Sequence, residues 1–272
     1  MEFITIQNAE IPALGLGTWK LRGEQCRETV RTALDLGYRH LDTAAYYDNQ
    51  RAVGEAIADS AVDPDDLFVT TKVRGSNLAA DAVRRSFADS YEALGLDIVD
   101  LLLIHWPSSR VPIAETVGAM NDLQAEGHLR HIGVSNFSVG QLEEAIDASE
   151  TPILTNQVEY HPFENRGDLL AFCIDHDVML TAYSPLDRGS SRVTGNDTLA
   201  EIGGRYGKTP TQVALRWLIQ QEVVSAIPKA TGREHLEENI DVFDFELTDE
   251  EMTQVFDLQG GMIDRVRSAL GL

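Results

Sequence analysis

The chain has 272 residues, 43% of them hydrophobic, and this composition excludes a disordered protein. No apolar stretch reaches the roughly 18 residues of a membrane span, and the N-terminus lacks the basic and apolar regions of a signal peptide. With 44 acidic and 22 basic residues the formal charge is −22, which disfavours nucleic acids and anionic membranes as partners. We therefore expect a soluble, cytoplasmic protein.

The charge excess is accompanied by an unusual choice of basic residues. Only four are lysines, at positions 20, 72, 208 and 229, and the other 18 are arginines. The acidic residues are spread along the chain rather than gathered in a tail. This composition fits an ordinary acidic enzyme or a protein that works in multimolar salt, where screening relieves the repulsion of such a surface. We favour the halophilic interpretation because acid excess and scarce lysine coincide.

Short β-rich runs recur along the chain and alternate with segments of helical periodicity. The strand-like runs are 14–16, 38–42, 67–71, 99–105, 130–134, 153–158, 178–183 and 223–227. The clearest helical segments are 24–37, 79–95, 113–127 and 139–149, and three of them end in glycine, as a left-handed C-cap requires. Runs such as VDLLLI are almost wholly apolar, which is typical of parallel strands buried on both faces.

Eight strand-helix units in one chain of this length predict an α/β fold, a (β/α)8 TIM barrel. The opening FITIQNAEIPALG predicts an N-terminal β-hairpin that closes the barrel bottom, and segments near 197–206 and 248–257 predict two extra helices. No linker or composition shift divides the sequence, so we expect a single domain over residues 1–272. A doubly wound open sheet is the weaker alternative, because the strand count reaches eight with no obvious domain break.

Several familiar motifs are absent from the sequence. GLGTWK (15–20) lacks the third glycine of a dinucleotide-binding fingerprint, and no helix follows it. Cys26 and Cys173 fall in predicted helices without metal spacing, so we expect buried free thiols. His128 and His131 have no evident third ligand, and we expect no metal site.

Polar or ionisable side chains follow most of the predicted strands. They are Asp42 and Tyr47, Lys72, His105, Ser135 and Asn136, Gln157, Tyr183 and Ser184, and Lys229. Singly, each has an ordinary explanation, such as a helix cap for Asp42 or a core histidine for His105. Together they predict one site, because the carboxyl ends of barrel strands meet at the same face.

Four of these residues match the chemistry of carbonyl reduction. Hydride transfer to a carbonyl carbon leaves an alkoxide that needs a proton, which Tyr47 could donate. A nearby ammonium, Lys72, would lower the high pKa of a phenol, and Asp42 would keep that ammonium charged. His105 could donate a hydrogen bond to the carbonyl oxygen and orient the substrate.

These segments resemble those of the aldo-keto reductases, in particular the prokaryotic diketogluconate and aldehyde reductase-like members. The similar segments run in family order from about residue 3 to residue 258. They are GYRHLDTAAYYDNQRAVGEAI (37–57), VTTKV (69–73), LLIHWP (102–107), GVSNF (133–137), NQVEYHP (156–162), AYSPL (182–186) and AIPKATGREHLEENIDVFDFELT (226–248). The resemblance implies an oxidoreductase that reduces aldehydes, ketones or sugar-derived carbonyls with NADP(H), with NAD(H) as a second cofactor.

The resemblance also implies roles for individual residues. Asp42, Tyr47, Lys72 and His105 would be the catalytic tetrad. Tyr183 would stack on the nicotinamide, Ser135, Asn136 and Gln157 would bind its carboxamide, and Ser184 and Leu186 would line the pyrophosphate path. Lys229, His235, Glu238 and Asn239 would meet the adenosine end, and Thr18, Trp19 and Asp42 would complete the cofactor site. Trp19, Tyr47, Arg74, His105 and Trp106 would form the substrate pocket.

Two positions depart from the family pattern. NADP-preferring members often carry Ser after the last-strand lysine and Arg six residues beyond it, where this chain has Ala230 and His235. The guanidinium that would bind a 2′-phosphate is missing, although Arg233 is near. Many members carry Trp two residues after the catalytic lysine, where this chain has Arg74, which could attract a carboxylate or a polyol or point to solvent.

Two other functions remain as alternatives. A barrel aldolase would use Lys72 as a Schiff-base nucleophile, and borohydride trapping of a substrate adduct would reveal it. A redox sensor would bind the nucleotide and signal to a partner without turnover, although a sensor has no need of a proton donor. Since no strongly apolar surface helix demands a partner, we expect a monomer.

The charge balance predicts a salt-dependent fold. At ~1 M salt the Debye length is about 3 Å, so the self-repulsion of the −22 chain is largely screened. We expect the melting temperature and the activity to rise from dilute buffer to multimolar KCl. A melting temperature that fell as KCl was raised would refute the halophilic interpretation.

Overall fold

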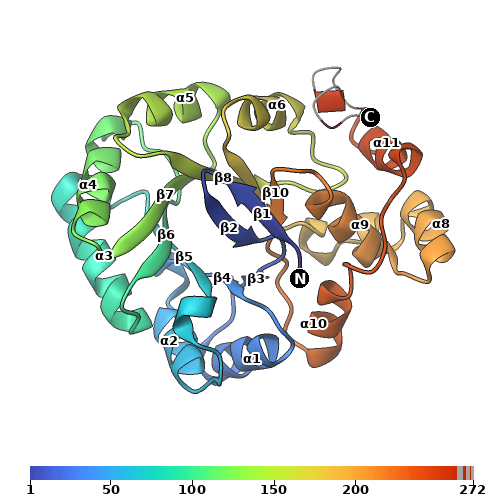
Figure 1. Ribbon diagram of the computed structural model, residues 1–272, viewed down its shortest axis with the longest axis horizontal. Helices are drawn as coiled ribbons and strands as arrows, with labels where there is room; N and C mark the ends of the chain where they lie inside the picture. The colour runs from blue at the N-terminus through green and yellow to red at the C-terminus, as the bar shows by residue number, and fades with distance from the viewer. Residues whose placement is uncertain (262–265, 268–269, 271–272) are drawn as a thin grey trace.

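Eight parallel strands surround a common axis in the computed structural model, which describes residues 1–261, 266–267 and 270 (Figure 1). The strands are β3 (Leu16–Gly17), β4 (His40–Asp42), β5 (Phe68–Val73), β6 (Val99–Ile104), β7 (Leu129–Ser135), β8 (Ile153–Glu159), β9 (Met179–Tyr183) and β10 (Val224–Ala226). Each strand pairs with its neighbours in chain order. Every residue of β5 and β6 is buried, as expected for strands covered on both faces.

The sheet closes into a barrel where its first and last strands meet. Leu14 forms a parallel bridge with Ala226, and the Gly17 amide donates to the Pro228 carbonyl at 3.1 Å. A Cβ on Gly17 would lie 2.7 Å from the Ile227 carbonyl oxygen, so this approach requires glycine. The predicted TIM barrel is therefore confirmed, and the open-sheet alternative is wrong.

Helices form a ring outside the strands (Figure 1). The ring contains α1 (Gly23–Asp35), α2 (Gln50–Ala58), α3 (Ala80–Leu94), α4 (Ile113–Ala125), α5 (Val139–Ala148), α6 (Gly167–Asp175), α9 (Pro210–Ile219) and α10 (Arg233–Ile240). The two predicted extra helices are α8 (Asp197–Tyr206) and α11 (Asp249–Asp257), and a short α7 (Ser191–Thr194) precedes them. Three short 3-10 helices complete the set: η1 (Ala45–Tyr47), η2 (Pro64–Asp66) and η3 (Asp187–Gly189). Gly95 caps α3 at φ +65°, as its position in the sequence predicted.

The N-terminal hairpin covers the end of the barrel opposite the strands' carboxyl ends. It pairs β1 (Phe3–Ile6) with β2 (Ala9–Pro12) through a turn in which Gln7 and Asn8 both have positive φ. The Gln7 side-chain amide donates to the Ile153 carbonyl at 3.1 Å and to the Asp177 carbonyl at 2.6 Å, which lie where β8 begins and just before β9. The predicted hairpin is therefore confirmed.

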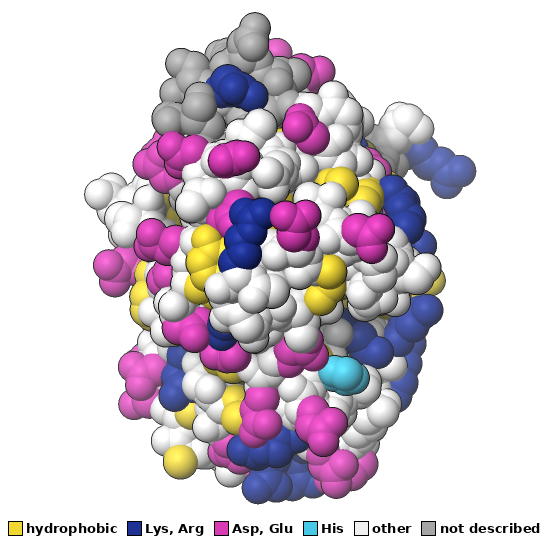
Figure 2. All heavy atoms as spheres, turned by 90° about the vertical axis from the view of Figure 1, so that its right-hand side faces the viewer, with side chains coloured by type: hydrophobic (Ala, Val, Ile, Leu, Met, Phe, Trp, Pro, Cys, Tyr) yellow, Lys and Arg dark blue, Asp and Glu magenta, His cyan; other side chains and the backbone are white. Residues whose placement is uncertain are grey.

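Arginines connect neighbouring helices across the acidic surface. Arg27 on α1 pairs with Asp59 at the end of α2 at 2.5 Å, and Arg84 on α3 pairs with Asp122 on α4 at 2.6 Å. Arg205 on α8 pairs with Glu251 on α11 at 2.9 Å. Acidic side chains are scattered over the face shown in Figure 2, with basic ones between them. A guanidinium reaches two carboxylates at once more readily than an ammonium, which suits a surface with so many acids.

The remaining structural predictions concern cysteines and metals. Cys26 and Cys173 are both free and fully buried, as predicted, and burial raises the pKa of Cys26 to about 11. Among residues 1–261, 266–267 and 270, no three His, Cys, Asp or Glu side chains are grouped as a metal ion would require. Nor does any helix in that part of the chain have the length and apolarity to cross a membrane.

One buried histidine makes the fold sensitive to acid. His40 is 1% exposed at the start of β4, and its Nε2 lies 3.3 Å from the Thr70 hydroxyl. Burial lowers the pKa of His40 to about 4, whereas an unfolded histidine titrates near 6.5. Between these two values the unfolded chain binds the extra proton, so the free energy of unfolding falls as the pH falls.

We predict that replacing His40 removes part of this acid sensitivity. The histidine contributes a loss of about 2 kcal/mol of stability between pH 7 and pH 5. The variant His40→Asn should therefore show a smaller drop in melting temperature over that range, whatever its stability at pH 7. The matched control is His128→Asn, at an exposed histidine, which should keep the wild-type drop. An unchanged drop in His40→Asn would contradict the prediction.

Candidate active site

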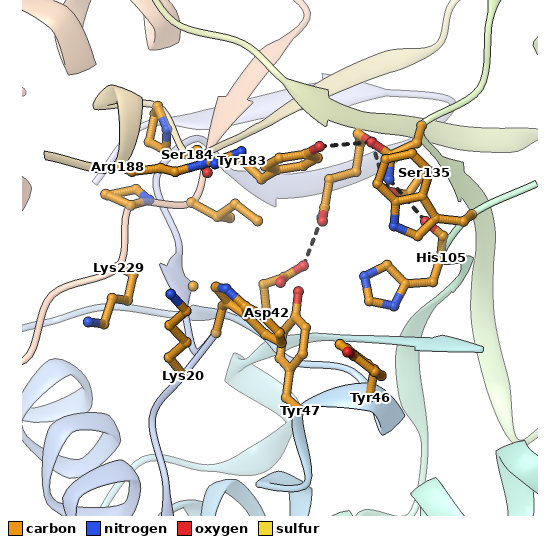
Figure 3. Close-up of a pocket in the computed structure, with 18 of the residues that line it drawn as sticks. Lys20, Asp42, Tyr46, Tyr47, His105, Ser135, Tyr183, Ser184, Arg188 and Lys229 are labelled. Carbon is orange, nitrogen blue, oxygen red and sulfur yellow. Dashed lines mark hydrogen bonds between the residues drawn. The ribbon is translucent and has the colours of Figure 1, made fainter. Parts of the chain in front are cut away.

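A cavity of about 1090 Å³ opens at the carboxyl ends of the barrel strands. Its lining includes Asp42 from β4, Ser135 from β7, Gln157 from β8 and Tyr183 from β9. Figure 3 shows Tyr46, Tyr47 and His105 on one side of this cavity and Lys20, Arg188 and Lys229 on the other. The barrel therefore gathers the predicted polar residues in one place, as its parallel strands require.

A buried ion pair lies at the base of the cavity. The Lys72 ammonium lies 2.5 Å from Asp42 Oδ1, and the two side chains are 0% and 2% exposed. The ammonium also donates to the Thr43 carbonyl at 2.9 Å and lies 3.5 Å from the Tyr47 hydroxyl. Lys72 thus has three oxygen partners, and one of them is the phenol predicted to donate the proton.

Tyr47 and His105 face each other above this pair. Tyr47 is the last residue of η1, and its ring lies 5.7 Å from the His105 ring and 4.8 Å from the Trp19 ring. Burial lowers the pKa of His105 to about 4, with the positive charges of Lys72 and Arg74 contributing. At neutral pH His105 is therefore an uncharged imidazole that can donate one N–H hydrogen bond.

The structure corrects one expectation about Tyr47. The sequence predicted that Lys72 would lower its pKa, but burial raises the pKa of Tyr47 well above the usual range, and the negative charge of Asp42 adds to this. Asp42 neutralises the ammonium, and burial also lowers the pKa of Lys72. Without a ligand, Tyr47 is therefore a protonated phenol, the form that a proton donor needs.

A chain of hydrogen bonds holds Ser135, Asn136 and Gln157, the residues predicted to bind the nicotinamide carboxamide. The Gln157 amide donates to Asp42 Oδ2 at 2.7 Å, so this side chain already binds the ion pair. The Asn136 amide donates to the His105 carbonyl at 3.0 Å, and its oxygen accepts a 2.9 Å bond from the Tyr183 hydroxyl (Figure 3). The Ser135 hydroxyl donates to the Gln157 carbonyl at 2.8 Å. These bonds fix the orientation of Tyr183 and of the loop that carries His105.

Several residues at the cavity adopt left-handed backbone conformations that side chains other than glycine rarely take. Lys20, Asn136, Ser184 and Arg188 all line the cavity with φ between +48° and +67°. Such conformations cost free energy and persist where surrounding contacts hold them. At Asn136 those contacts are the two hydrogen bonds described above.

The charge of the lining is opposite to that of the whole protein. Four basic side chains, Lys20, Arg74, Arg188 and Lys229, line the cavity, against Asp42 as the one acidic side chain there among the described residues. The whole chain has twice as many acidic as basic residues. A positively lined cavity in an acidic protein attracts an anionic ligand.

Some predicted site residues do not line the cavity. Thr18 is buried behind it and donates its hydroxyl to the Asp42 carbonyl at 2.9 Å, and Lys72 lies beneath Tyr47. His235, Glu238 and Asn239 lie on α10, outside the lining. His235 is 72% exposed and 3.6 Å from Glu238, whose carboxylate accepts a hydrogen bond from Thr209. Their contacts with the adenosine end stay predictions.

The predicted substrate-pocket residues do come together. Trp19, Tyr47, Arg74, His105 and Trp106 all line the cavity. The sequence prediction missed further lining residues, among them Lys20, Tyr46, Gly75, Ser76 and Arg188. For Lys20 the sequence did contain a signal, because lysine is scarce in this chain. Two of its four lysines, Lys20 and Lys229, line the cavity.

Comparison with known proteins identifies the class of enzyme to which this barrel belongs. The aldo/keto reductase family model matches residues 13–259. The chain belongs to the aldo-keto reductase family, NAD(P)H-dependent oxidoreductases whose members reduce carbonyls to alcohols.

Individual relatives agree with this assignment. The chain is 40% identical over 258 residues to a 9,11-endoperoxide prostaglandin H2 reductase of Trypanosoma cruzi, covering 94% of this chain and 90% of that protein. It is 39% identical over 247 residues to a glyoxal reductase of Bacillus subtilis, covering 90% and 88%. The solved structure of a diketogluconate reductase-like protein is 44% identical with a TM-score of 0.93, covering 97% of this chain and 94% of that one.

Proposed function

We propose that this protein reduces aldehydes, ketones or sugar-derived carbonyls with NAD(P)H, and that Tyr47 donates the proton. The observation that carries the proposal is the chain of contacts from Asp42 through the buried Lys72 to the Tyr47 hydroxyl, at the base of a positively lined cavity. Metal-independent carbonyl reduction needs a proton donor of this kind, together with a hydrogen-bond donor for the carbonyl oxygen.

Each residue of the tetrad has a distinct task. When bound, a nicotinamide dinucleotide supplies hydride to the carbonyl carbon. Neutral His105 donates a hydrogen bond to the carbonyl oxygen and fixes its position beside Tyr47. Tyr47 gives its proton to the oxygen as negative charge develops there. The Lys72 ammonium then stabilises the phenolate that remains, and Asp42 keeps the ammonium in place.

The cavity has the features that a nicotinamide dinucleotide requires. Lys20, Arg188 and Lys229 offer positive charge for phosphates, and Tyr183 offers an aromatic face held by Asn136. We propose NADP(H) as the cofactor, with NAD(H) also accepted, because His235 lacks the charged fork of an arginine and Arg233 is paired with Glu237 at 2.8 Å.

The alternatives fit the site less well. An aldolase would need the Lys72 amine to reach a substrate carbonyl, but this side chain has no exposed surface and lies outside the cavity lining. A redox sensor would not need the contacts that join Asp42, Lys72 and Tyr47, and turnover of any carbonyl would exclude it. We also propose a monomeric, cytoplasmic, single-domain enzyme adapted to high salt, on the strength of its composition and its arginine-linked helices.

We predict that Tyr47→Phe removes the proton donor and leaves the cofactor cavity intact. The value of kcat should fall by at least the roughly 10²–10⁴-fold typical of general acid catalysis, while nucleotide affinity stays close to wild type. Steady-state kinetics and fluorescence titration with NADPH would measure the two quantities. The control is Tyr46→Phe, which keeps the aromatic ring beside the site. A kcat close to the wild-type value in Tyr47→Phe would contradict the proposal that Tyr47 donates the proton.

The cofactor proposal predicts a weak preference for NADPH over NADH. The arginine fork missing at position 235 would contribute roughly 10- to 150-fold in selectivity through charge-assisted hydrogen bonds. We expect measurable NADH activity in wild type and a higher ratio of the two kcat/KM values in His235→Arg. The wild type could instead favour NADPH over NADH by more than roughly 10³, with no further increase in His235→Arg. Another group would then bind the 2′-phosphate, and Arg233 is the first candidate.

A further inference from the structure

Aromatic side chains are exposed where the cavity meets solvent. Among the described residues, the exposed large hydrophobic side chains include Trp19, Tyr46 and Trp106, and all three line the cavity. The rings of Trp19 and Tyr46 are stacked, with centroids 5.6 Å apart and planes inclined by 16°. The three side chains are still 40–53% exposed, so part of each ring is free to contact a substrate.

Arg74 lies against this aromatic mouth. It follows the last residue of β5, and its guanidinium carbon lies 4.8 Å from the centre of the Tyr46 ring. Its Nη2 lies 3.4 Å from the Ala45 carbonyl oxygen. Stacking on an aromatic face holds a guanidinium in a defined plane, so Arg74 is oriented before any ligand binds.

The charge of Arg74 is only partly compensated by the protein. Its one ion pair in the described chain is with Asp48, at 3.6 Å, and that carboxylate is 74% exposed. Arg84, by contrast, pairs with Asp122 and Glu126 at 2.6 and 2.7 Å. A long pair with an exposed carboxylate contributes little free energy, so an incoming anion can replace or share it.

The position of Arg74 relates it to the reacting groups. The Arg74 guanidinium stacks on the Tyr46 ring, and the centre of this ring lies 6.3 Å from that of the His105 ring. Tyr46 therefore contacts both Arg74 and His105. The Arg74 charge is also close enough to His105 to contribute to the lowering of its pKa. A group bound by Arg74 would therefore lie near the carbonyl that His105 orients.

We propose that Arg74 binds a carboxylate on the substrate, so that the enzyme prefers aldehydes and ketones carrying a carboxylate a few bonds from the reducible carbon. The proposal rests on the proposed reductase function and names its substrate class. The planar guanidinium would bind the carboxylate through charge-assisted hydrogen bonds, and the aromatic mouth would contact the carbon skeleton between the two groups. Arg74 is then a specificity-determining residue.

The first test compares two substrates that differ only in charge, 4-carboxybenzaldehyde and 4-carbamoylbenzaldehyde. Wild type should favour the acid. In Arg74→Met, which keeps an apolar chain against Tyr46, kcat/KM for the acid should fall about 10- to 100-fold, mainly through KM, and kcat/KM for the amide should stay within about threefold. Arg74→Lys keeps the positive charge but lacks the guanidinium fork, so its kcat/KM for the acid should lie between those of wild type and Arg74→Met.

A second variant should shift specificity in the opposite direction. Asp48→Asn removes the carboxylate that competes for Arg74, and asparagine tolerates the left-handed conformation of this residue, φ +50°. Its preference for the acid should rise several-fold. The control Arg31→Met, on the outer surface of α1, makes the same change in net charge as Arg74→Met and should leave the preference unchanged.

Equal losses on both aldehydes in Arg74→Met would overturn the proposal and leave Arg74 a structural clamp on Ala45. A fall in the preference in Arg31→Met equal to that in Arg74→Met would also overturn it, because net charge would then explain the effect.

A binding experiment tests the same contact without turnover. Tryptophan fluorescence would follow the binding of two product analogues, 4-(hydroxymethyl)benzoate and 4-(hydroxymethyl)benzamide. If neither aldehyde is reduced, the proposed reductase function fails. The role of Arg74 is still decided by binding: wild type should bind the benzoate more tightly than the benzamide, and Arg74→Met should lose this difference.

Discussion

The buried pair of Lys72 and Asp42 is the constraint on which the site depends. Taking both charges out of water costs several kcal/mol per ion unless close partners compensate. The partners come from distant segments: the Thr43 carbonyl accepts from Lys72, and Gln157 on β8 donates to Asp42. The compensation therefore exists only when β4, β5 and β8 are assembled in the closed barrel, so folding and chemistry depend on the same contacts.

Charge is distributed unequally between the surface and the cavity. The surface carries the acid excess, and arginines link its helices in pairs such as Arg84 with Asp122 and Glu126. The cavity instead presents four basic side chains. High salt would screen the long-range field of the surface, whereas direct contacts inside a partly enclosed cavity would be affected less. Recognition by direct contact would therefore suit the proposed adaptation to high salt better than long-range attraction.

The two sides of the cavity serve different purposes. On one side Asp42, Lys72 and Tyr47 are buried and joined by hydrogen bonds, which suits the proposed reaction because it needs defined geometry. At the mouth, Trp19, Tyr46 and Trp106 are exposed, and Arg74 is loosely paired. Under the proposed mechanism, changes at the mouth would alter which carbonyl compound binds without disturbing Tyr47. Arg74 and its neighbours would then determine specificity, and Tyr47 would determine reactivity.

The sequence by itself determined the barrel, the hairpin, the extra helices and the grouping of Asp42, Tyr47, Lys72 and His105 at one end of the barrel. Periodicity and glycine caps are local signals, and parallel strands bring their ends together whatever the loops do. Only the tertiary structure decided that burial raises the pKa of Tyr47, that Gln157 binds Asp42, and that Lys20, Tyr46 and Arg188 line the cavity. It also decided that Arg74 stacks on Tyr46 rather than extending into solvent. These outcomes depend on burial and on contacts between residues far apart in the chain, which no local pattern records.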